Sequence, residues 1–96
     1  MTQPRIRLTG HIDVPADRHA AVTDALPTHI KLTRAEPGCL SFEVTPDPAI
    51  KGRYNVAELF TNRAAFDAHQ TRAKASDWAT ITDGIPRTYE IEEITS

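Results

Sequence analysis

The 96-residue sequence predicts one α+β domain, spanning residues 1–96, with elements in the order β-α-β-β-α-β. Three observations predict this order. Apolar and polar residues alternate in four short segments, as in strands that are buried on one face. Apolar residues recur every three or four positions in two longer segments, as in amphipathic helices. Proline and glycine gather between these segments, where turns are expected.

The first strand and the first helix are expected in the N-terminal third of the chain. Residues 5–14 alternate strictly, and Pro15 fixes φ at a point where a helix can begin. The helical spacing then continues to about Arg34, and its apolar face would hold His19, Val22, Leu26, Ile30 and Thr33. Pro27 lies inside this helix and has no N–H to donate. We therefore expect a kink there, or two consecutive short helices.

A hairpin of two antiparallel strands is expected next. Glu36-Pro37-Gly38 ends the first helix, because the residue before a proline leaves the α region and glycine permits positive φ. Alternation returns in residues 39–45 and again in residues 53–60, and the turn-rich segment PDPAIKG connects them. These two segments predict the second and third strands.

The remaining third of the chain predicts a second helical region and the last strand. Asn62 can cap a helix whose apolar face would hold Ala65, Phe66, His69 and Ala73. Ser76 can cap a further turn that contains Trp78 and stops at Gly84. Residues 87–94 alternate once more. The complete order is that of a ferredoxin-like fold, a four-stranded antiparallel sheet with both helices on one face.

The core of such a domain would be thin. Leu, Ile, Val and Phe together account for 20 of the 96 residues, which is close to the lower limit for a packed globule. A second copy would add stability by covering the helix-free face of the sheet, so we expect a homodimer. The residues expected on that face are His11, Ser41, Tyr54 or Val56, and Tyr89.

Composition argues against several classes of function. The net charge is −2 with both signs interspersed, which does not favour nucleic-acid binding. Apolar runs are too short for a membrane span and the N-terminus lacks the pattern of a signal peptide, so the expected location is cytoplasmic. Cys39 has no partner for an internal disulfide and is interpreted as a small buried hydrophobe. His19 and His29 are not at a chelating spacing, and no metal site is expected.

Three stretches carry a resemblance to a known family: EPGCLSFEV at 36–44, AELF at 57–60 and TNRAAFDAHQ at 61–70. In this order and spacing they resemble the antibiotic biosynthesis monooxygenase family, which includes small quinol monooxygenases. The resemblance implies a dimeric α/β barrel in which two sheets pack face to face, with a pocket between sheet and helices in each subunit. It also implies insertion of oxygen into a quinol, an anthrone-like compound or a related phenolic aromatic, without metal, flavin or haem as cofactor.

Cofactor-free oxygenation needs a base, a group that stabilises an oxyanion and a cavity that excludes water. His69 is the best candidate for the base, and it resembles the recurrent histidine of the family. A purely structural hydrogen bond to Glu58 on the preceding strand explains the histidine equally well. Asn55 could hold a substrate oxygen or close a strand edge, and Trp78 could stack on an aromatic substrate or anchor the core. Arg72 and Glu58 are further candidates for substrate binding.

One position departs from the family pattern. Many quinol-type members have a second histidine about five residues after the first, where this chain has Lys74. This departure leaves room for a different or anionic ligand in a pocket shaped by Arg72, Lys74 and Trp78. The alternatives to a monooxygenase are a ligand-binding or stress-associated dimer without catalysis, and an isomerase or lyase on the same fold. Haem-degrading relatives in the same superfamily have an asparagine on the first strand and a tryptophan before the helical histidine. This chain has no asparagine on its first strand and Trp78 follows His69, so the resemblance does not favour haem degradation.

Overall fold

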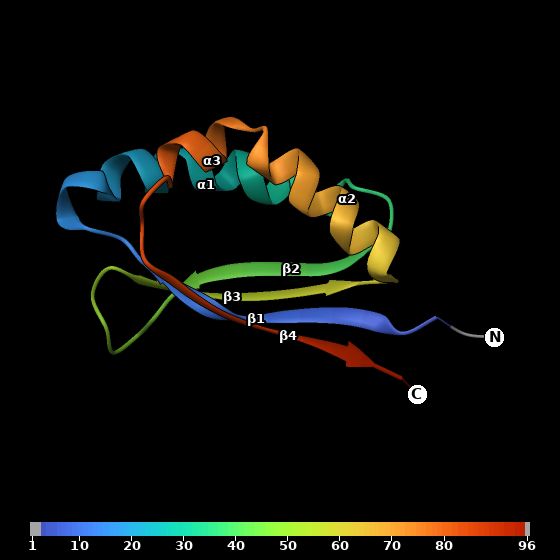
Figure 1. Ribbon diagram of the computed structural model, residues 1–96. Helices are drawn as coiled ribbons and strands as arrows, with labels where there is room; N and C mark the ends of the chain where they lie inside the picture. Colours follow the sequence, from blue (N-terminus) through green and yellow to red (C-terminus); the bar gives the residue numbers. More distant parts are fainter. Residues whose placement is uncertain (1–2, 96) are drawn as a thin grey trace.

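The computed structural model describes residues 3–95, and their elements form two layers, a sheet and a set of helices on one of its faces (Figure 1). The strands are β1 (Arg5–Asp13), β2 (Cys39–Pro46), β3 (Arg53–Phe60) and β4 (Arg87–Ile94). The helices are α1 (His19–Arg34), α2 (Arg63–Lys74) and the short α3 (Asp77–Ile81), with a 3-10 turn at Ala16–Arg18. The predicted ferredoxin-like α+β fold is confirmed.

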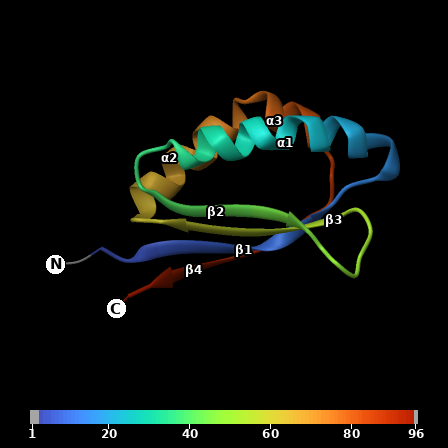
Figure 2. The same ribbon diagram turned by 180° about the vertical axis from the view of Figure 1, so that it is seen from behind.

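All strand pairs are antiparallel, and the strands lie in the order β2-β3-β1-β4. The predicted hairpin pairs β2 with β3, with an irregularity in register between Cys39 and Ser41. In both views β2 lies beneath the helices, whereas β4 is the strand farthest from them (Figures 1 and 2). Every residue of β4 up to Glu93 is exposed as a result, although four of them face the helix side.

The core lies between the sheet and the helices. Its fully buried side chains come from alternate strand positions, among them Ile6, Leu8, Phe42 and Phe60, and from Val22 on α1. The strict alternation of residues 5–14 therefore translates into burial, because successive side chains of a strand point to opposite faces. Gly10 in β1 leaves room for the Tyr89 ring on the neighbouring strand, because a Cβ at this position would lie 2.8 Å from Cδ1 of that ring.

Two sequence predictions about the sheet are wrong. Tyr54 and Val56 are buried on the helix side, and Tyr89, opposite Gly10 in the register, faces that side as well. The helix-free face instead carries their neighbours along β3, Asn55 and Ala57, together with His11 and Ser41 as expected. The error arises because residues 53–60 contain apolar side chains at both odd and even positions, so that the alternation alone does not fix the buried face.

Of the two outcomes expected at Pro27, the division into two short helices is not observed. One α-helix runs from His19 to Arg34 with Pro27 inside it. Both halves of the helix are held against the sheet by buried side chains. These are Val22 and Leu26 before Pro27, and His29 and Thr33 after it.

Candidate functional site

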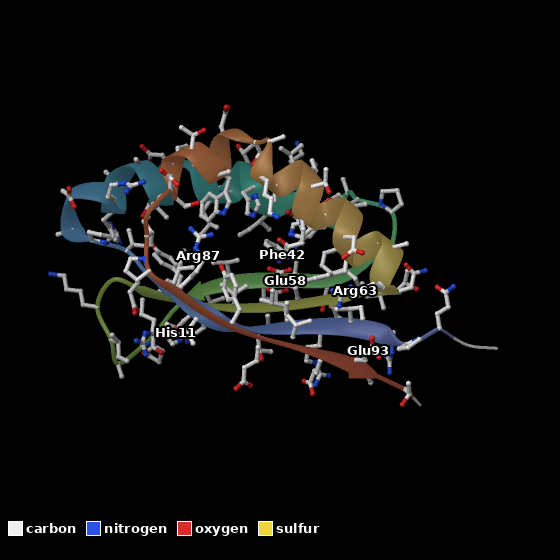
Figure 3. The ribbon with its side chains drawn as sticks, in the orientation of Figure 1. His11, Phe42, Glu58, Arg63, Arg87 and Glu93 are labelled. Atoms are coloured by element: carbon white, nitrogen blue, oxygen red, sulfur yellow. The ribbon has the colours of Figure 1, made fainter. Side chains whose placement is uncertain are left out.

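A cavity of about 160 Å³ lies between the helices and the sheet. Its walls contain the aromatic side chains Phe42, Trp78 and Tyr89 and the polar side chains His29, Glu58, His69, Lys74 and Arg87. Figure 3 shows Phe42, Glu58 and Arg87 in the space between the two layers, with His11 on the far side of the sheet. A cavity of about 150 Å³ is large enough for benzene, so this one has room for a single aromatic ring.

The position of His69 in the cavity wall depends on where α2 begins and on the helical spacing that follows. The side-chain oxygen of Asn62 accepts a hydrogen bond from the Ala65 amide at 2.9 Å, which fixes the start of the helix as predicted. Phe66 and His69 then lie on the same face and are both buried. The His69 ring stacks on the Phe60 ring, with 5.0 Å between centroids and 28° between planes. This packing fixes the orientation of the imidazole.

A carboxylate holds the far side of the imidazole. Nδ1 of His69 lies 2.7 Å from Oε1 of Glu36, in the segment that ends α1. Arg72 donates through Nη2 to the same oxygen at 3.2 Å and to Thr33 Oγ1 at 3.0 Å. An oxygen that already accepts from a guanidinium is an acceptor for the histidine too, so the proton belongs on Nδ1 and Nε2 remains free to accept one.

Glu58 lies next to the free nitrogen of His69. Its Oε1 is 3.7 Å from His69 Nε2, too long for a hydrogen bond, and within residues 3–95 this oxygen has no hydrogen-bond partner. Only 7% of Glu58 is exposed. Burial raises the pKa of the Glu58 carboxyl to about 7, and the nearby Glu36 carboxylate adds to the rise. Glu58 can therefore hold or release a proton near neutral pH.

A second histidine reaches the cavity from α1. His29 stacks on Trp78 with 4.5 Å between centroids and 7° between planes, and it meets Phe42 edge-on at 5.4 Å. Burial lowers the pKa of His29 to about 4, with smaller contributions from Arg72 and His69, so the ring is neutral near pH 7. Its Nδ1 is buried, with no hydrogen-bond partner among the described residues. His29 is thus a neutral imidazole in the cavity wall, with 6.3 Å between its ring centroid and that of His69.

The structure brings His69, Glu58 and Trp78 together in the cavity wall, places Arg72 behind His69 on the shared Glu36 oxygen, and separates Asn55 from all of them. Asn55 is exposed on the helix-free face, where its Nδ2 donates to Oδ2 of Asp47 at 3.0 Å. The prediction that its amide points into the cavity is therefore wrong, because Asn55 is one position out of phase with the buried side chains of β3. Arg72 lies beside the cavity rather than in its lining, and its guanidinium binds Glu36 and Thr33.

Sequence reasoning missed two residues of the site, Glu36 and His29. The spacing 22, 26, 29, 33 on α1 follows the helical period and could have identified His29 as buried. Glu36 was interpreted only as part of a helix exit. Its contact with His69 joins residues that are 33 positions apart, which no local pattern indicates.

Cys39 is half-buried, and burial, aided by Glu36 and Glu58, raises the pKa of its thiol, which disfavours the reactive thiolate. Across residues 3–95 no group of three or more His, Cys, Asp or Glu side chains is arranged to hold a metal ion. No helix in the same range is long and apolar enough to cross a membrane.

The sequence pattern described as antibiotic biosynthesis monooxygenase matches residues 5–80, well over half of the chain. The chain belongs to this family. The match covers β1 through most of α3 and thus every residue of the Glu36–His69–Glu58 cluster. It leaves β4 outside, and with it Arg87 and Tyr89 at the mouth of the cavity.

Solved structures of low sequence identity share the fold. A conserved protein of Bacteroides thetaiotaomicron, for which an oxidoreductase activity has been suggested, superimposes with a TM-score of 0.83 at 17% identity, covering 96% of this chain and 99% of the other. A Nitrosomonas europaea protein classed with the antibiotic biosynthesis monooxygenases gives 0.78 at 21% identity, covering 92% and 95%. A similarly classed protein of Caulobacter crescentus gives 0.77 at 22%, covering 99% and 93%.

A curated relative, an uncharacterized protein of Synechocystis sp., is 33% identical over 64 residues. The aligned part is 67% of this chain but only 44% of the relative. The sequence pattern thus shows the family, and the solved structures show the fold.

Proposed function

We propose that the protein is a monooxygenase that oxidises a phenolic aromatic of one ring, such as a quinol, with dioxygen and without a cofactor. The observation that supports this most strongly is the cluster at His69. Its Nδ1 is held by Glu36 at 2.7 Å, its Nε2 lies 3.7 Å from Oε1 of Glu58, and both His69 and Glu58 line a cavity large enough for one ring. A carboxylate on one side of an imidazole and a substrate site on the other is an arrangement suited to a general base.

The reaction begins with removal of a phenolic proton by His69 Nε2. The resulting phenolate is electron-rich and can transfer an electron to dioxygen. The phenoxyl radical and superoxide then combine into a peroxide anion, which takes the proton back from His69 to give a hydroperoxide. Loss of water from the hydroperoxide breaks the O–O bond, leaves one oxygen on the ring as a carbonyl and yields a quinone. Overall, the ring loses two hydrogen atoms and gains one oxygen atom, while the second oxygen atom of dioxygen leaves as water.

The surroundings of His69 support this sequence of steps. Neutral Glu58 can donate a hydrogen bond to the phenolic oxygen, and its pKa of about 7 lets it exchange protons with His69 during turnover. Trp78 and Phe42 supply flat apolar walls for the ring. The size of the cavity favours one ring over the anthrone-like substrates that the sequence left open, because three fused rings need far more than about 160 Å³.

Oxygen uptake with a panel of quinols tests the proposal. The wild type, His69→Ala and Glu36→Gln are compared on metal-free protein, with Asn55→Ala as a polar-residue control on the opposite face of the sheet. Loss of a general base costs about 100- to 10,000-fold in rate, so His69→Ala should lose nearly all activity and Asn55→Ala should keep it. Equal rates for the wild type and His69→Ala would remove His69 from the mechanism. Tight binding of quinols without oxygen uptake would favour a non-catalytic binding protein.

A further inference from the structure

The mouth of the cavity carries two positive charges that have no role in the mechanism above. Lys74, at the end of α2, and Arg87, at the start of β4, both line the cavity and are both exposed. Within residues 3–95 neither side chain has an ion-pair partner, whereas the cation at Arg72 is paired with Glu36. The cavity thus has proton-transfer groups in its buried part and unpaired cations at its opening.

Arg87 is held in place without being neutralised. Its Nη2 donates to the Thr82 carbonyl at 2.8 Å, and its Nε donates to the Ile85 carbonyl at 3.3 Å. Both acceptors are neutral backbone groups, so they orient the guanidinium and leave its charge available. A guanidinium fixed in this way loses little conformational freedom on binding an anion and can form two parallel hydrogen bonds to a carboxylate. Figure 3 shows the Arg87 side chain directed into the space between sheet and helices.

The geometry points to a substrate with one phenolic ring and one anionic substituent, most simply a carboxylate. This inference deepens the proposed function and rests on it for the phenolic part of the ligand. The ring would lie in the cavity lined by Phe42, Trp78 and His29, with its hydroxyl group at His69. The carboxylate would lie at the mouth, against Arg87 and Lys74. The lysine that stands where many relatives have a second histidine would then serve binding rather than proton transfer.

The charges in the cavity favour this orientation over the reverse. A carboxylate placed in the buried part would lose its hydration close to the Glu36 carboxylate, and like charges in a buried site repel strongly. At the mouth the same carboxylate stays partly hydrated and lies near the cations of Lys74 and Arg87. A neutral quinol would fill the cavity equally well but would leave both cations unused.

Binding of three related ligands without oxygen tests the inference. Under argon, titration calorimetry compares 2,5-dihydroxybenzoate, its methyl ester and hydroquinone, which share the quinol ring and differ in charge. The carboxylate should bind about tenfold more tightly than the ester, and this preference should weaken as salt is added. Equal affinity for the carboxylate and the ester would overturn the inference.

Variants show which cations are responsible. Arg87→Gln and Lys74→Gln should each weaken binding of the carboxylate by about tenfold and leave the ester within a factor of about two. Arg87→Lys keeps the charge and should retain part of the preference, which covers the case in which Arg87→Gln disturbs the fold. Arg63→Gln is the matched control, since Arg63 is paired with Asp67 and does not line the cavity. A loss of affinity for all three ligands alike in Arg87→Gln would show a structural role and contradict the inference.

Oxygen uptake separates the failure of this inference from that of the proposed function. Preferential binding of the carboxylate without oxygen consumption would leave the anion site standing and refute the oxygenation. Oxygen consumption with hydroquinone, combined with no preference for the carboxylate, would leave the oxygenation standing and refute the anion site.

Discussion

On the helix side of the sheet, Glu58 and His69 are buried among aromatic rings, whereas on the outer side Asp13 and Arg53 meet in an ion pair open to water. Each pair has one residue on β3: Glu58 points to the helix side, and Arg53 points to the outer side. Glu58 has no hydrogen bond on its Oε1 within residues 3–95 and a pKa raised to about 7. Asp13 accepts from Arg53 through both oxygens, at 2.7 and 3.2 Å, and this contact lowers its pKa.

The difference shows which face of the sheet carries a group with an altered proton affinity, namely the helix side with Glu58. A charge that is partly solvated and paired changes the energy of the protein little, because water already stabilises it. A buried and incompletely paired carboxyl has a strongly altered affinity for protons, which is a property that catalysis can use. Changes on the helix side of the sheet should therefore have larger effects than changes on the outer side.

Truncation of the core should have the largest effect. Phe60 is fully buried and supports the His69 ring, so Phe60→Ala should lower the free energy of unfolding by about 3–5 kcal/mol. Glu43→Ala, on the outer face of the adjacent strand, should change it far less. Urea denaturation followed by circular dichroism measures both. Similar losses for the two variants would contradict the assignment of the faces.

The two perturbed groups of the cavity should act on stability in opposite directions with pH. Glu58 has a raised pKa, so the folded state keeps its proton between about 4.5 and 7 while the unfolded state releases it, and stability falls over this range by on the order of 3 kcal/mol. His29 has a lowered pKa, so the unfolded state binds the extra proton between about 4 and 6.5, and stability rises with pH over that range.

Variants should expose each slope. Glu58→Gln should leave a protein whose stability rises from about pH 4 to 6.5, whereas His29→Gln should leave one whose stability falls from about pH 4.5 to 7. In the wild type the two slopes oppose each other where the ranges overlap. Urea midpoints measured at several pH values test this, and identical profiles for the two variants would contradict it.

For the outer face, we propose that it forms the interface of a twofold dimer. Ala57 lies near the centre of that face, opposite Thr9 on one side and Glu43 on the other. Ala57→Arg should therefore raise the dissociation constant of the dimer by about tenfold or more, equivalent to roughly 1.4 kcal/mol. Sedimentation measures this, and a wild type that is a stable folded monomer at micromolar concentration would contradict the dimer.

The smallest effect is expected for the exposed ion pair. Asp13→Asn should lower the urea midpoint only slightly at pH 7, because the pair is solvated. The lowered pKa of Asp13 means that its contribution is present above its ordinary pKa of 3.8 and is lost as the pH falls through the lower folded value. The difference between variant and wild type should thus vanish in strong acid. A difference that persists there would have another cause.

The order of the elements could be predicted from the sequence because each element has its own local pattern, alternation in a strand and a spacing of three or four residues in a helix. The bounds 53–60 and 87–94 match β3 and β4, and the Asn62 cap is present. The face of β3 could not be predicted, since Tyr54 and Val56 alternate with Ala57 and Leu59, and tertiary packing alone decides which set is buried. The assignment of Asn55 to the site depended on that face and was wrong for the same reason.

The cavity divides in a similar way. His69, Glu58 and Trp78 could be predicted because each stood out within its own segment. The contact between Glu36 and His69 could not be predicted from the spacing, because it depends on how the end of α1 packs against α2. Arg87 had no distinguishing signal, since its charge is significant only once Lys74 lies in the same cavity wall.

The central claim is that the ring of a phenolic ligand binds on the helix side of the sheet, with its oxygen at His69. A crystal structure of the protein with hydroquinone, grown without oxygen, tests this most directly. We predict electron density for the ring in the cavity lined by Phe42, Trp78 and His29, with one hydroxyl group within hydrogen-bond distance of His69 Nε2. A ring bound on the outer face, beside Asn55 and His11, with the helix-side cavity empty, would contradict it.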